Sequence, residues 1–180
     1  MLPQPSFFKT QMSHPVVSSL KVLFICLGNI CRSPAADGIL HQKVEDAGLS
    51  DAILIDSAGI GGWHRGQLPD ERMRRHAARR GYNLTHRARQ FQGAADMEHF
   101  DYVMVMDRQN YDDVYSQCVT AQQRAKIHYL GKFLQNHPGV SIIPDPYYGG
   151  DADFELVLDL LEDACEGFLL FLQETLRKEK

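Results

Sequence analysis

The segment that most constrains the fold lies near the start of the chain, where an apolar run passes into a short polar loop. The run covers residues 22–25, the loop reads CLGNICRS over residues 26–33, and Pro34 follows. Gly28 and Asn29 tolerate left-handed dihedrals, and proline is frequent at the first position of a helix. Successive N–H groups in such a loop, together with a helix N-terminus, make a concave anion site. The segment therefore predicts a strand-to-helix junction that binds an anion.

Further apolar runs alternate with helical patterns along the rest of the chain. We expect three more strands at residues 53–55, 101–106 and 126–130, and helices at 35–47, 70–81, after Asp107 and at 154–176. This alternation predicts an α/β fold with a parallel sheet and helices on both faces. Ligands bind such sheets beyond the C-terminal ends of the strands. The loops after residues 26 and 59, Asp107 and the loop that holds Asp145 should therefore meet at one edge.

Length and composition favour a single domain. With 180 residues, 44% of them hydrophobic, the chain can bury one core and is short for two. Residues 1–20 hold no Asp or Glu and no continuous apolar core, so we predict a flexible N-terminal extension at 1–20 and a domain at 21–180. An organellar transit segment is the weaker alternative, because these residues lack arginine.

Charge and cysteine content limit the partners and the compartment. The net charge of −4 argues against general nucleic-acid binding, and no run of eighteen apolar residues predicts a membrane span. Four thiols suit a reducing compartment, so we expect a cytoplasmic protein. Arginines gather between residues 65 and 89, which indicates either a solvated helix face or a docking surface for acidic phosphopeptides.

Cys26 and Arg32 give the loop a chemistry that an ordinary phosphate site lacks. A thiol attacks only as the thiolate, and loop N–H groups, a helix N-terminus, Arg32 and the Ser33 hydroxyl would all stabilise negative sulfur. Arg32 can hold two phosphate oxygens at once. The spacing therefore predicts in-line attack by Cys26 on phosphorus and a phosphocysteine intermediate.

The leaving oxygen then needs a proton, and Asp145 is the candidate donor. Proline on both sides, at positions 144 and 146, restricts the backbone and holds the carboxyl exposed. Once ionised, the same group could accept a proton from the water that hydrolyses the intermediate. Tyr147 and Tyr148 are suited to line a cleft for an aromatic ring. The alternative for Asp145 is ordinary turn chemistry.

The remaining cysteines and the histidines admit plainer interpretations. Cys31 is either a small loop residue or a partner for a reversible disulfide with Cys26. Cys118 and Cys165 are expected to be buried in the core. Eight histidines without metal-binding spacing predict no metal site.

The chain resembles the low-molecular-weight protein tyrosine phosphatases over residues 22–172, in the motifs VLFICLGNICRSP, DSAG with GGWH, HRARQF, FDYVMVMD and PDPYYGGDADFE. The resemblance implies a single-domain, three-layer α/β/α fold with a four-stranded parallel sheet (phosphotyrosine phosphatase I-like) and no cofactor or metal. It makes Cys26 the nucleophile, Arg32 the phosphate and transition-state ligand and Asp145 the general acid. Expected partners are phosphotyrosine-containing proteins, and the chain should be a monomer or weak dimer.

The resemblance also assigns roles around the loop. Asn29, Ser57 and His86 would hold it in a strained, anion-ready shape, while Trp63 and the two tyrosines would enclose the substrate ring. The residues expected to bind phosphate or substrate are Leu27, Gly28, Asn29, Ile30, Cys31, Ser33, Trp63, Tyr147 and Tyr148. Ile60 stands where many similar bacterial chains carry Thr, a departure at the cleft rim.

Three other functions remain to be weighed. A thiol-coupled arsenate reductase resembles this fold and its loop, but its disulfide relay needs closely placed cysteines, and Cys118 and Cys165 lie far apart. A phosphoarginine phosphatase resembles the chain but carries Thr where Ile30 stands, which favours phosphotyrosine here. A non-catalytic phosphate-binding module is disfavoured by the intact Cys, Arg and Asp.

Overall fold

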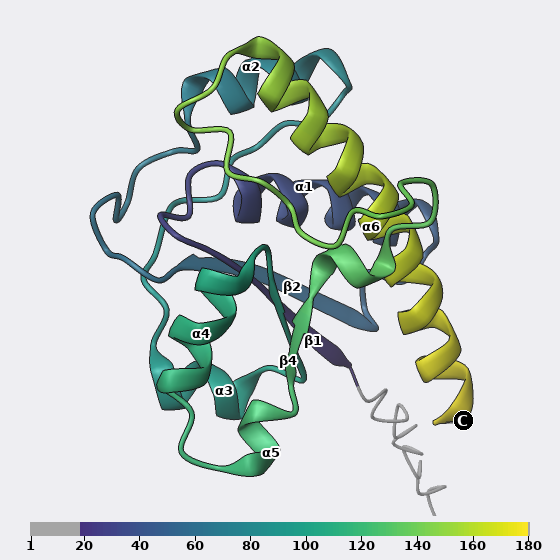
Figure 1. Ribbon diagram of the computed structural model, residues 1–180. Coiled ribbons are helices and arrows are strands. Elements are labelled where there is room, and N and C mark those ends of the chain that lie inside the picture. The colour runs from purple at the N-terminus through teal and green to yellow at the C-terminus, as the bar shows by residue number, and fades with distance from the viewer. Residues whose placement is uncertain (1–18, 180) are drawn as a thin grey trace, which may run out of the picture.

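A computed structural model describes residues 19–179, and in them a four-stranded, all-parallel sheet forms the centre of the protein. The strands are β1 (Leu20–Cys26), β2 (Ile53–Gly59), β3 (Tyr102–Val105) and β4 (Ile127–Tyr129), and they lie in the order β2-β1-β3-β4 (Figure 1). Residues 1–18 of the predicted N-terminal extension lie outside the described residues. Leu20 already pairs with Ile53 in the sheet.

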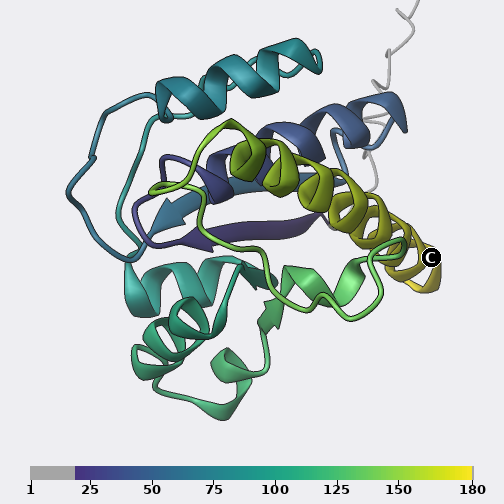
Figure 2. The ribbon, with the colours of Figure 1, turned by 45° about the horizontal axis from the view of Figure 1, so that its top comes forward.

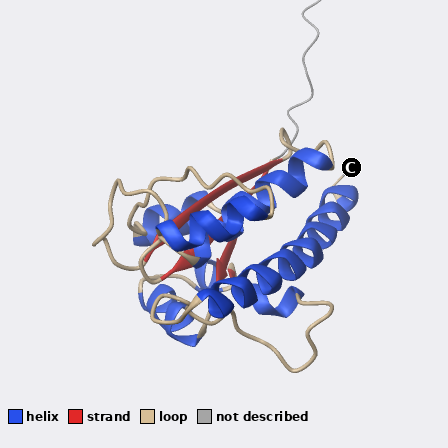
Figure 3. Cartoon of the chain, turned by 90° about the horizontal axis from the view of Figure 1, so that it is seen from above, coloured by secondary structure: helices blue, strands red, loops and turns tan. Residues whose placement is uncertain are grey.

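Helices cover both faces of the sheet, as predicted. Helices α1 and α6 lie against each other on one face, and α3, α4 and α5 lie on the other (Figures 1 and 2). Helix α2 packs against α6, and the view from above shows the strands between helices (Figure 3). The bounds are α1 Arg32–Asp46, α2 Glu71–Arg79, α3 Gly93–His99, α4 Arg108–Ser116, α5 Ala121–Arg124, α6 Asp151–Lys178 and a 3-10 helix Leu130–Phe133.

The position of β1 between two layers of helices explains why its apolar run is continuous. Val22 and Phe24 belong to the larger core beneath α1 and α6, whereas Leu23 and Ile25 belong to a second core beneath α3 and α4. Side chains alternate between the faces of a strand, and helices cover both faces here, so every position of the run is buried. All four side chains have no exposed area.

The predicted strands all form, whereas several helix limits differ. Helix α1 begins at Arg32, so Pro34 is its third residue and not its first. The first turn of a helix has no internal acceptors for its N–H groups, so proline is tolerated there too. Helix α6 starts three residues earlier than predicted, at Asp151, and ends at Lys178. Helices α3 and α5 were not predicted.

The uneven charge distribution has a structural explanation at Arg80. Its guanidinium forms ion pairs with Glu155, Asp159 and Glu162 on α6, the latter two at 2.8 and 3.1 Å. Arg80, which directly follows α2, therefore meets acidic residues of α6, and part of the arginine cluster stabilises the packing of the two helices. Among the described residues, no helix is long and apolar enough to cross a membrane.

Candidate active site

The loop between β1 and α1 turns sharply around Asn29. Asn29 has φ of 56° and is the only non-glycine residue with positive φ in the described chain; Gly28, which also tolerates this conformation, does not adopt it. Asparagine accepts left-handed dihedrals better than other non-glycine residues. The neighbouring strand leaves room for the loop at Gly59, where an added Cβ would lie 2.8 Å from the Gly28 carbonyl carbon.

Cys26 is the last residue of β1, and its thiol lies next to the first turn of α1. Its Sγ is 3.0 Å from the hydroxyl oxygen of Ser33, the second residue of that helix, and both residues are buried. The positive end of the helix dipole and a hydroxyl that can donate a hydrogen bond both favour negative sulfur. The arrangement therefore suits the predicted thiolate nucleophile.

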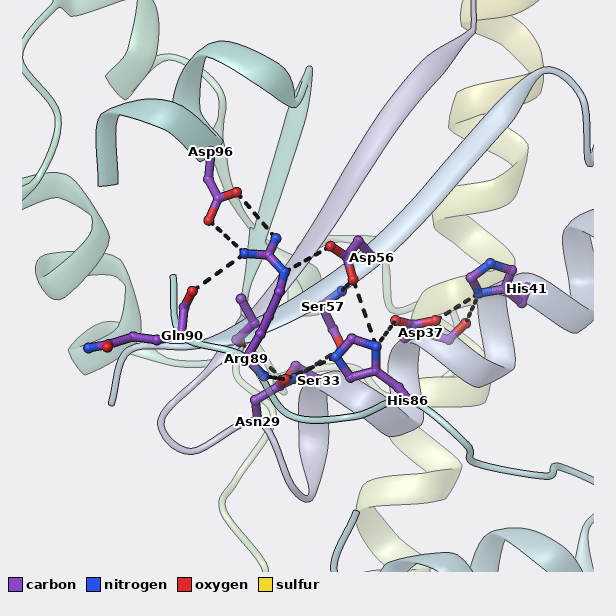
Figure 4. A network of polar contacts seen from close by, with 11 residues as sticks. Asn29, Ser33, Asp37, His41, Asp56, Ser57, His86, Arg89, Gln90 and Asp96 are labelled. Carbon is purple, nitrogen blue, oxygen red and sulfur yellow. Dashed lines mark hydrogen bonds and ion pairs between the residues drawn. The ribbon is translucent and has the colours of Figure 1, made fainter. Parts of the chain in front are cut away.

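The Asn29 side chain connects the loop to neighbouring segments through four hydrogen bonds (Figure 4). Its Nδ2 donates to Ser33 Oγ at 2.8 Å and to Ser57 Oγ at 3.0 Å. Its Oδ1 accepts from His86 Nε2 and from the Arg89 backbone N–H, both at 3.0 Å. Asn29, Ser33 and Ser57 are buried, so the side chain links the loop, α1, β2 and residues 86–89 in one network.

A second layer of charged groups orients His86 and Arg89. Because the Asn29 oxygen can only accept, His86 Nε2 must carry the proton, and its Nδ1 faces Asp37 and Asp56 at 3.7 Å each. The ligand atoms of Asp37, Asp56 and His86 lie within 4.8 Å of one another, close enough to hold a metal ion. However, Asp37 also contacts His41 at 2.7 Å and Asp56 accepts from Arg89 at 2.9 Å, so both carboxylates have partners in the protein.

Arg32 is oriented by two carboxylates and a carbonyl. Its Nη1 donates to Asp107 at 2.6 Å and to the Ile143 oxygen at 3.0 Å, while its Nη2 donates to Asp145 at 3.4 Å. Burial lowers the pKa of Arg32, but the charges of Cys26, Asp145 and Asp107 and the hydrogen bond to Asp107 together raise it above the usual value. The guanidinium therefore keeps its charge although only 2% of the side chain is exposed.

Asp107 contacts Arg32, an interaction that the sequence analysis did not predict. Its Oδ2 holds Arg32, while its Oδ1 caps α4 by accepting from the Asn110 N–H at 2.9 Å. The available signal was its position two residues after the end of β3, at the sheet edge where the loops were predicted to meet. Its capping role was apparent from the sequence, but its ion pair was not.

A cavity of about 270 Å³ opens above the loop. It brings together Cys26, Arg32 and Asp145, which are far apart in the sequence, and its walls are formed by the following residues: Leu27, Gly28, Ile30, Cys31, Trp63, His64, Tyr147 and Tyr148. The predicted residues Asn29, Ser33, Ser57 and His86 do not line it. Of the lining residues, His64 is the one that the sequence analysis missed.

The aromatic walls differ in how firmly they are held. Trp63 and Tyr148 are 68% and 94% exposed, which leaves their faces available to a ligand. The Trp63 ring lies over Gly61, where an added Cβ would approach it to 2.0 Å. Tyr147 is less exposed and packs edge-on against Tyr148. The cavity therefore has a charged floor and an aromatic rim.

All four cysteines are free and buried, as predicted for Cys118 and Cys165. Burial raises the pKa of the Cys31 thiol far above its usual range, and the negative charge of Asp70 adds to this effect. Cys31 therefore stays protonated and does not compete with Cys26 as a nucleophile.

Comparison with known proteins agrees with this geometry. The family model described as low molecular weight phosphotyrosine protein phosphatase matches residues 21–180. A chain from Synechocystis sp., named among low molecular weight protein-tyrosine-phosphatases, is 44% identical over 87% of this chain and 99% of its own length. The low molecular weight phosphotyrosine protein phosphatase of Sus scrofa is 40% identical over 88% of this chain and 98% of its own.

Solved structures show the same fold. A protein tyrosine phosphatase from Entamoeba histolytica, with Hepes in its active site, superposes with a TM-score of 0.83 at 39% identity, covering 87% of this chain and 99% of that one. A Drosophila arginine phosphatase superposes with a TM-score of 0.77 at 33% identity, covering 84% and 97%. Proteins with two differently named activities thus share this fold.

Proposed function

We propose residue roles for the reaction of this chain, which belongs to the low molecular weight phosphotyrosine protein phosphatase family. The chain is a protein tyrosine phosphatase, and its substrates are phosphoproteins. The observation that carries the residue assignment is the meeting of Cys26, Arg32 and Asp145 around one cavity, with Arg32 held 3.4 Å from the Asp145 carboxylate.

In the first half-reaction, Cys26 Sγ attacks phosphorus and the bond from phosphorus to the leaving oxygen breaks. Protonated Asp145 gives its proton to that oxygen, so the product leaves as a neutral phenol or alcohol. Arg32 binds two of the remaining phosphate oxygens, where negative charge spreads as the bonds rearrange. Asp107 orients the Arg32 guanidinium through their ion pair.

In the second half-reaction, water attacks the phosphocysteine and the sulfur–phosphorus bond breaks. The Asp145 carboxylate accepts the proton of the attacking water, and Cys26 leaves as the thiolate. Inorganic phosphate is released and Asp145 is again protonated.

Phosphotyrosine-containing proteins are the proposed substrates. Trp63 and Tyr148 both line the cavity and offer exposed aromatic faces, which suits a flat ring. Ile30 lines the same cavity and has no polar group with which to contact a guanidinium, so phosphoarginine is the less favoured substrate. A monomer or weak dimer and a cytoplasmic location belong to the same proposal, and four free cysteines support a reducing compartment.

A pre-steady-state assay with a phosphotyrosine peptide and a phosphoarginine peptide tests mechanism and substrate together. We expect a burst of product from the phosphotyrosine peptide, because the intermediate accumulates before hydrolysis. The variant Cys26→Ser should bind phosphate but release no product. Product release by Cys26→Ser would refute the nucleophile assignment, and a larger burst with phosphoarginine would refute the substrate assignment.

A further inference from the structure

Arg72, the second residue of α2, makes contacts that reach the loop carrying Cys26. Its backbone N–H and its Nε donate to Asp70 Oδ1 at 2.8 and 3.1 Å, and its Nη2 donates to Asp70 Oδ2 at 3.0 Å. The Asp70 backbone N–H in turn donates to the Ile30 carbonyl at 2.8 Å. The guanidinium is therefore held in one orientation relative to the nucleophile loop.

The same guanidinium lies over two aromatic rings. Its central carbon is 4.7 Å from the centre of the Phe154 ring and 5.4 Å from the centre of the Tyr147 ring. Phe154 is fully buried in the first turn of α6, whereas Tyr147 belongs to the loop that carries the acid. A cation at these distances attracts the face of an aromatic ring. Arg72 thus connects the Tyr147 ring to α2 and to the buried Phe154 ring.

Tyr147 is joined directly to the general acid. Its backbone N–H donates to Asp145 Oδ1 at 3.1 Å, and the other carboxylate oxygen of Asp145 faces Arg32. The Tyr147 ring also packs edge-on against Tyr148, with ring centres 4.9 Å apart. A displacement of Tyr147 would therefore move both the Asp145 carboxylate and one wall of the cavity.

We propose that Arg72 is a positioning residue for the reaction, which couples the nucleophile loop to the acid loop by holding Asp70 with its polar edge and Tyr147 with its flat face. The proposal rests on the proposed function, because it assigns Arg72 an effect on proton donation by Asp145. A flat, delocalised cation with several donors is needed to bind a carboxylate at its edge and a ring on its face.

Leaving-group dependence separates this role from a general effect on stability. A poor leaving group such as that of phenyl phosphate needs the proton from Asp145, while the good leaving group of p-nitrophenyl phosphate needs it less. In Arg72→Met we expect kcat/KM for phenyl phosphate to fall about fivefold and that for p-nitrophenyl phosphate by less than about twofold, in line with one partly exposed cation–π contact. Equal losses for both substrates would overturn the proposal.

Matched variants complete the test. Arg79→Met removes a cation from an exposed position of the same helix and should leave both rates unchanged. Arg72→Lys, which keeps the charge but not the planar group, should give an intermediate loss on phenyl phosphate and serves as the test variant if Arg72→Met fails to fold. A loss in Arg79→Met as large as that in Arg72→Met, or a Lys variant with unaltered rates on phenyl phosphate, would contradict the assignment.

A double-mutant cycle with Tyr147→Leu tests whether Arg72 affects the rate through its contact with the Tyr147 ring. If Arg72 acts through the Tyr147 ring, Arg72→Met should change the rate on phenyl phosphate by less than about twofold once that ring is absent, because coupled sites are not additive. Full additivity would show that Arg72 acts elsewhere. Failure of the proposed function itself would look different, because unaltered Cys26-containing protein would then hydrolyse neither aryl phosphate.

Discussion

Replacing Asn29 by alanine should both destabilise the protein and disable the loop. The side chain makes four hydrogen bonds, two to buried hydroxyls and two to the partly buried His86 and Arg89. Each such bond contributes a net free energy of about 1 kcal/mol, and an alanine at a left-handed position costs about 1 to 2 kcal/mol more. Because the two partly buried partners can be solvated, we expect a loss of about 3 to 5 kcal/mol in the free energy of unfolding.

Urea unfolding in phosphate-free buffer measures this loss, since a bound anion would add its own stability. Ser57→Ala is the matched control: it removes one of the four bonds and should cost about 1 kcal/mol. We also expect kcat/KM of Asn29→Ala to fall at least about 100-fold, because a displaced loop would misalign its donors, and losing one aligned donor to a transition state typically costs that much. A destabilisation no larger than that of Ser57→Ala would refute the idea that Asn29 holds the loop.

Two further perturbations test the surroundings. Asp107→Asn keeps an N-cap for α4 but removes the charge opposite Arg32, so stability should change by less than about 1 kcal/mol while kcat/KM falls about 10- to 100-fold, as for a charged hydrogen bond; a large stability loss with normal kinetics would contradict this. Burial raises the pKa of Asp163, but hydrogen bonds from His137 Nδ1 and two backbone N–H groups lower it overall. The ionised group therefore stabilises the fold above its unfolded pKa of about 3.9, and this contribution is lost as the pH falls through the lower folded value. Unfolding of Asp163→Asn between pH 2 and 6 should show a stability deficit that closes at low pH, and a constant deficit would argue against it.

Local patterns predicted the sheet well and the small helices poorly. The strands were recognisable because helices on both faces make their apolar runs continuous, as at residues 22–25 in β1. Helices α3 and α5 contain only 7 and 4 residues and few buried side chains, so no periodic pattern identifies them. The early start of α1 depends on the turn at Asn29 and was not visible in the position of Pro34.

The residues of the candidate site also differ in how well the sequence predicted them. Cys26, Arg32 and Asp145 were identified from residue type and immediate context, because a thiol, a guanidinium and a constrained carboxyl carry a recognisable chemistry. The contacts of Asp107 and Arg72 with the site were not predicted, because each acts on a residue from a distant part of the chain: Asp107 on Arg32, and Arg72 on Tyr147.

By itself, the amino-acid sequence determined the chemistry of the loop and the alternation of strands and helices, since both depend on neighbouring residues. Only the tertiary structure decided which distant groups contact the remaining residues of the site: the carboxylates around Arg32, and the packing of α2 against α6 that places Arg72 over Tyr147. Hydrogen bonds and ring contacts act over a few ångströms in space, and no local pattern records which distant residues come within that range.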